Sequence, residues 1–89
     1  MRVTDPLGVE WEVSRRRAGI GRTWVVEARS ERGELGWRLR GARRARRAQT
    51  DVASAFARGE RSFSPAGAER VLPVSPLSSH EQRNVRVLR

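Results

Sequence analysis

The chain has 89 residues, which limits it to one small domain with a small core. Its basic residues are all arginine, and 19 of them against 10 acidic residues give a formal net charge of +9. The absence of cysteine excludes disulfides, thiolate catalysis and cysteine-ligated zinc. No apolar run is long enough to span a membrane or form a signal peptide. We therefore expect a soluble cytoplasmic protein, and arginine in place of lysine is typical of a GC-rich bacterial genome.

The first elements expected along the chain are two strands. Residues 2–4 can open a short strand, and the Pro- and Gly-containing segment 5–8 then reads as a turn. Val9, Trp11 and Val13 alternate with polar residues, and this period of two indicates a strand with one buried face.

Two further strands are expected around a polar hairpin loop. The segment 22–29 is rich in β-branched and aromatic residues, and residues 31–34 form the loop. Leu35, Trp37 and Leu39 then alternate with polar residues and glycine. Because the loops between these segments are short, we expect the three main strands to form an antiparallel meander.

Each main strand carries one tryptophan, and the three are spaced by 13 residues at Trp11, Trp24 and Trp37. Exposed together, the rings would form a stacking platform for nucleic-acid bases. Trp11 and Trp37 share their strand face with valine and leucine, however, and this favours a place in the core.

The apolar pattern changes to a helical period between residues 42 and 58. Apolar residues, most of them small, recur at steps of three, four and one along one stripe, which consists of Ala45, Ala48, Val52, Ala55 and Phe56. Gly59 is a plausible stop signal. Four arginines crowd the expected first two turns, where the helix dipole disfavours cations. A helix that begins later, near Gln49, is the alternative.

The predicted fold is therefore α+β, with a three-stranded antiparallel β-meander packed on one main helix. Residues 61–63 are expected to be extended, and residues 66–72 to form one or two helical turns. We predict a single domain over residues 1–72, a Pro/Ser linker over 73–79, and a C-terminal helix or flexible tail over 80–89.

Catalysis finds little support in the sequence. His80 is the single histidine and is expected in solvent beside the Ser-rich linker. Glu10 and Glu12 lie on the same strand face, but nearby arginines offset their charge. We therefore predict no enzyme activity, no metal site and no cofactor.

The arginines are the best indication of function. Six of them fall between Arg38 and Arg47 without an acid among them, at the junction of the last main strand and the helix. Guanidinium groups pair bidentately with phosphates and carboxylates. The candidate anion-binding residues are Arg15, Arg16, Arg17, Arg38, Arg40, Arg43, Arg44, Arg46 and Arg47.

Three strands followed by a helix over residues 9–58 resemble small DNA-binding modules that lay a three-stranded sheet on DNA, such as integrase arm-binding and plant AP2-type domains. That docking would bring Glu10 and Glu12 towards the phosphates, so a contact through the helix or a loop is favoured. The expected function is a nucleic-acid-binding or nucleic-acid-associated accessory protein. The alternative is an interaction module whose basic face binds an acidic protein; a membrane-surface role is less favoured. A homo-oligomer would add stability to so small a domain.

Overall fold

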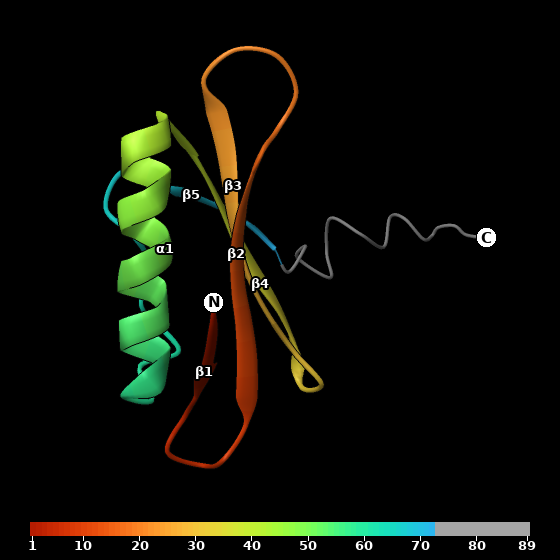
Figure 1. The fold of residues 1–89 in the computed structure, drawn as a ribbon, viewed down its shortest axis with the longest axis vertical. Coiled ribbons are helices and arrows are strands. Elements are labelled where there is room, and N and C mark those ends of the chain that lie inside the picture. Colours follow the sequence, from red (N-terminus) through yellow and green to blue (C-terminus); the bar gives the residue numbers. More distant parts are fainter. Residues whose placement is uncertain (73–89) are drawn as a thin grey trace, which may run out of the picture.

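The computed structural model describes residues 1–72 as a five-stranded antiparallel sheet in the order β1-β2-β3-β4-β5, packed against one helix (Figure 1). The elements are β1 (Arg2–Thr4), β2 (Glu10–Arg17), β3 (Thr23–Ser30), β4 (Gly33–Arg40), α1 (Ala42–Ala57) and β5 (Glu69–Leu72). The α+β class and the antiparallel order are confirmed, as is the short strand at residues 2–4. The expectation of three strands is wrong, because short strands extend the meander at both edges.

In the segment 66–72, where helical turns were expected, residues 66 and 67 form a turn and Glu69–Leu72 form the edge strand β5. Gly67 has a φ of +72°, which ends any right-handed helical turn at this position. The chain then pairs with the free edge of β4, and Leu72 packs over Gly36. A Cβ at Gly36 would lie 3.2 Å from two Leu72 carbon atoms, so the glycine makes room for β5.

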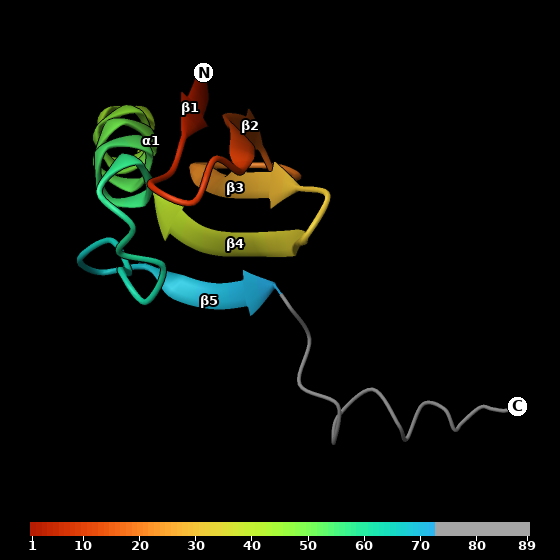
Figure 2. The same cartoon turned by 90° about the horizontal axis from the view of Figure 1, so that it is seen from below.

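The core lies between α1 and one face of the sheet (Figure 2). Phe56 of α1 is fully buried between two tryptophans, with ring centroids 4.8 Å from Trp11 and 6.4 Å from Trp37 in edge-to-face geometry. Trp24 is half-buried against the same cluster. The core role expected for Trp11 and Trp37 is confirmed, and it leaves no exposed tryptophan platform.

Helix α1 begins at Ala42, so the expected early start is confirmed and a start near Gln49 is wrong. The predicted alanine stripe is buried and lets the helix lie close to the sheet. Gly59, at a φ of +85°, follows the last turn and donates its N–H to Phe56 O at 2.9 Å. The linker expected over 73–79 and the C-terminal segment expected over 80–89 lie outside the described residues.

Candidate anion-binding site

One end of the molecule is built from segments that are distant in the sequence. The β2–β3 loop, the last residues of β4 and the first turn of α1 lie together at the top of Figure 1. The pairing of Thr23 with Arg40 and a 2.8 Å hydrogen bond from Gly41 N–H to Arg22 O join these segments. The hairpin register therefore brings the arginines of the loop beside those of the helix.

We call this end, together with the first two turns of α1, the basic end. Its arginine side chains are exposed, and none forms a salt bridge with another of residues 1–72. They are Arg15, Arg17, Arg22, Arg40, Arg43, Arg44, Arg46 and Arg47. Two of them have neutral acceptors: Arg15 donates to the Gln49 side-chain oxygen, and Arg17 Nη2 donates to Gly21 O at 2.8 Å. Within residues 1–72, no salt bridge therefore compensates their positive charge, although Asp51 and Glu69 lie nearby.

The two remaining candidates, Arg16 and Arg38, belong to the sheet face opposite α1. Arg16 Nη2 lies 3.5 Å from Glu27 Oε2, and Arg38 Nη2 lies 3.2 Å from Glu69 Oε1. Glu27 is also 3.6 Å from Arg29 and keeps only 8% of its side chain exposed. Long arginine side chains and carboxylates thus cover this face, and their charges are largely compensated within the chain.

On the same face, the charge of Glu12 in β2 is also compensated within the chain. Glu12 accepts a 2.8 Å hydrogen bond from the Met1 ammonium group, and this hydrogen bond and the ammonium charge hold the pKa of Glu12 below its usual range. Glu12 also pairs with Arg2 at 3.5 Å. The sheet face therefore offers little net positive charge to an outside anion.

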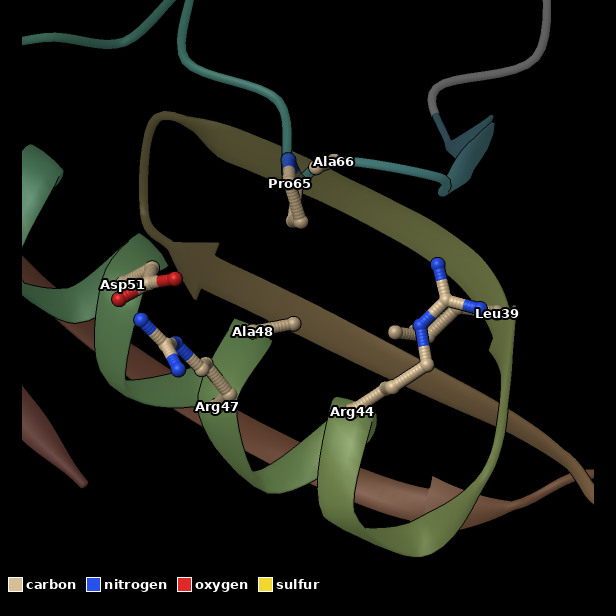
Figure 3. A pocket seen from close by; sticks show the side chains of 7 residues that line it. All are labelled: Leu39, Arg44, Arg47, Ala48, Asp51, Pro65 and Ala66. Atoms are coloured by element: carbon tan, nitrogen blue, oxygen red, sulfur yellow. The ribbon is translucent and has the colours of Figure 1, made fainter.

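Arg44 occupies the centre of the basic end, because it lines three adjoining hollows. The first, of about 190 Å³, lies between α1 and the segment that leads to β5 (Figure 3). Its walls are Leu39, Arg44, Arg47, Ala48, Asp51, Pro65 and Ala66. Figure 3 shows the Arg44 side chain extending from α1 towards Leu39, while Ala48 and Pro65 supply apolar walls.

The second hollow, of about 380 Å³, continues from Arg44 towards β4 and includes Glu69. The backbone of Gly67 borders it, and a Cβ at that position would collide with Arg44 Nη2. Because this nitrogen is the far end of a flexible side chain, a Cβ at Gly67 would displace the guanidinium group. Since Glu69 already pairs with Arg38, this hollow is partly neutralised.

The third hollow differs because none of the acidic residues within 1–72 lines it. It is an open depression of about 590 Å³ at the start of α1, formed by Arg22, Arg40, Gly41, Ala42, Arg43 and Arg44. The first turn of α1 has no acidic residue, and Gly41 provides no side-chain cap. The positive end of the helix dipole therefore adds to four guanidinium charges in the same depression.

Like charges on α1 also repel each other. Arg43 is followed by arginines three and four residues later, and Arg44 by one three residues later. Like-charged pairs at these spacings cost roughly 0.2–0.5 kcal/mol each in exposed helices. An anion in the depression would reduce this repulsion and would find unpaired backbone N–H groups in the first turn.

Arg22 is a site residue that the sequence reasoning missed. It immediately precedes β3, and it reaches the depression only because Thr23 pairs with Arg40. Gln49 was missed too: it is 7% exposed, accepts from Arg15 and donates to Val13 O at 2.9 Å. This buried amide links the end of β2 to α1 and so helps to hold the basic end together.

Within the described part of the chain, no group of three or more His, Asp or Glu side chains gathers with metal-binding geometry. Glu10 lines a shallow hollow with Gly8 and Glu31 at the opposite end of the molecule. Among residues 1–72, no helix has the length and apolar character needed to cross a membrane. His80 lies outside the described residues.

Comparisons with protein-family models, with curated proteins and with solved structures gave no match to this chain.

Proposed function

We propose that this protein binds the phosphate backbone of nucleic acid through the basic end. The observation that carries the proposal is the gathering of exposed arginines around the depression at the start of α1, none of them in a salt bridge with another of residues 1–72. Nucleic acid presents a continuous array of phosphates, and most of its non-specific affinity for proteins comes from such contacts.

The arrangement of the charges favours a contact through the helix and the loop. The sheet face opposite α1 is compensated by ion pairs, whereas the depression has no acid in its wall. Phosphates would therefore approach the depression, with Arg22, Arg40 and Arg43 around them. Sheet-on-DNA docking, which the three-strand resemblance implied, would instead meet Glu10 and Glu12.

Arginine suits this role better than a diffuse positive charge would. Its planar guanidinium group donates two parallel hydrogen bonds to one phosphate, and it stays charged at any physiological pH. Arg44 borders all three hollows, so its guanidinium group can contact a phosphate backbone that passes from one hollow to the next. We assign no base-specific contact, because phosphate contacts position a duplex without reading its sequence.

The test is an electrophoretic mobility shift with random-sequence duplex DNA and duplex RNA at low and high salt. We expect a shift at low salt that weakens steeply as salt rises. The variant Arg43→Ala/Arg44→Ala should bind at least about tenfold more weakly, because each lost charge-assisted contact contributes roughly 1.5–3 kcal/mol.

The matched control is Arg32→Ala/Arg58→Ala, which removes the same charge from exposed residues at the other end of the molecule. It should bind like the unmodified chain. Equal losses in the two variants would mean that only net charge matters, and no shift of either duplex at low salt would refute the proposal.

A further inference from the structure

Ile20 stands at the tip of the β2–β3 loop with 99% of its surface exposed. The other large exposed apolar residues within 1–72 are Met1 and Leu7, at 51% and 75%. Single apolar residues on a surface are common. Ile20 is distinguished by a loop that carries it away from the domain and by the arginines on both sides of it.

The loop is anchored at its base and open at its tip. Ala18 N–H donates to Thr23 O at 3.0 Å, and Arg17 Nη2 donates to Gly21 O at 2.8 Å. Gly19 and Gly21 flank the isoleucine with φ values of +75° and +93°, and a Cβ built on either would meet nothing within 4 Å. The tip therefore projects from the domain on a backbone bend that favours glycine.

Positive charge surrounds this apolar tip. Arg17 precedes it, and Arg22, which lines the acid-free depression, follows it. The 2.8 Å hydrogen bond from Gly41 to Arg22 fixes the end of the loop against the first turn of α1. A polyanion bound in the depression would thus have Ile20 next to it.

We propose that Ile20 is an apolar wedge that enters the minor groove of duplex DNA and inserts at a base step. The inference rests on the proposed function and extends it by naming the groove and the contact. Minor-groove proteins commonly insert isoleucine or a similar side chain between base pairs and so kink the duplex, while basic residues hold the backbone on each side. Here Arg17 and Arg22 occupy those flanking positions.

A membrane surface is the competing occupant for an apolar tip with basic neighbours. Stable attachment to a membrane requires a larger apolar area than one side chain provides. Leu7 lies in the β1–β2 loop at the opposite end of the molecule and cannot reach the same surface (Figure 1). Duplex DNA therefore accounts for a single exposed Ile20 better than a membrane surface does.

The test uses a duplex of about 20 base pairs with a central TA step and a fluorescent donor and acceptor at its ends, because such steps kink easily. Binding of the full chain should bring the dyes closer together. Ile20→Ser should abolish this bending and weaken binding by about tenfold, whereas Ile20→Leu should preserve both. Since Ile20 is exposed, neither variant should change the thermal midpoint.

The outcomes separate the two proposals. If the full chain binds the duplex but leaves it straight, or if Ile20→Ser bends it equally, the wedge is refuted and the phosphate-binding function stands. If the full chain does not bind this DNA duplex, the wedge fails, and the phosphate-binding function fails with it only if duplex RNA is not shifted either. Flotation with phosphatidylserine-containing vesicles, lost in Ile20→Ser, together with no bending of the duplex, would overturn the wedge in favour of a membrane contact.

Discussion

Asp5 is the most heavily hydrogen-bonded side chain in the described part of the chain, although it lies far from the basic end. Its Oδ1 accepts the N–H groups of Leu7 and Val9, both at 2.9 Å. Its Oδ2 accepts Trp11 Nε1 at 3.2 Å and Arg61 Nη2 at 2.6 Å, and the side chain is 1% exposed. This carboxylate closes the β1–β2 turn and fixes the chain that follows α1.

The pKa of Asp5 predicts how stability depends on pH. The hydrogen bond from Arg61 lowers this pKa most, backbone and Trp11 hydrogen bonds lower it further, and burial opposes them. A lowered pKa in the folded state means that the stabilisation is complete above the unfolded value of about 3.9 and is lost as pH falls below it. Urea unfolding measured between pH 7 and pH 2 should therefore show stability declining below about pH 4.

The variants Asp5→Asn and Glu31→Gln identify the group responsible. Asn keeps an acceptor for the two backbone N–H groups but places an amide against Arg61 or Trp11, so stability at pH 7 should drop and the acid-dependent decline should become shallower. Glu31 is exposed in the hairpin turn, and Glu31→Gln should leave the pH profile unchanged. An unaltered profile in Asp5→Asn would show that Asp5 does not control acid stability.

At the scale of elements, the attachment of α1 to the sheet depends on a few large side chains among many small ones. The buried stripe of the helix is mainly alanine, and Phe56 supplies its one aromatic contact to Trp11 and Trp37. Trp37 Nε1 also donates to Ser64 Oγ at 3.3 Å, which ties the segment after the helix to β4. Phe56 therefore anchors the last turn of α1.

Truncating Phe56 should remove that anchor. Phe56→Ala leaves a cavity between two tryptophan rings, and such truncations cost roughly 3–5 kcal/mol. Urea unfolding followed by tryptophan fluorescence would measure the loss. Leu7→Ala, which alters a residue 75% exposed, should change the free energy of unfolding by less than about 0.5 kcal/mol. Similar values for the two variants would contradict the packing described here.

The sequence predicted most firmly the elements with a clear period, namely β2, β4 and α1. Half-buried strands alternate and helix α1 repeats every three to four residues, because each has one face in the core. β5 lacks this signal: it has four residues and exists because β4 offers a free edge and Gly36 leaves space for Leu72. Such a strand forms only by pairing with a neighbouring strand that is distant in sequence. The local sequence does not contain this information, and it favoured helical turns instead.

At the scale of the whole molecule, the excess positive charge of residues 1–72 is concentrated at one end. The opposite end, formed by the β1–β2 loop, the β3–β4 turn and the end of α1, mixes arginines with Glu10, Glu31 and Glu60. Arginine density alone pointed to the strand–helix junction. It did not indicate that Arg16 and Arg38 pair with Glu27 and Glu69, since strand register decides those contacts.

Salt dependence should report how many arginines contact phosphate. In a plot of log binding constant against log salt concentration, each neutralised phosphate contributes about −0.9 to the slope for duplex DNA. Arg43→Ala/Arg44→Ala should therefore flatten the slope by about 1.8 if both side chains make contact. Fluorescence anisotropy between about 50 and 200 mM salt would measure it. An unchanged slope would place the contact elsewhere on the molecule.

The uneven placement of charge within residues 1–72 also gives this part of the chain an electric dipole that points along its strands. The electric field of a polyanion exerts a torque on a protein with such a dipole before the two make contact. The torque orients the arginine-rich end towards the polyanion. A larger share of collisions then begins in a productive orientation, and association is faster than random tumbling would allow. Reversing the dipole, with glutamates at that end and arginines at the other, would slow the encounter at constant net charge.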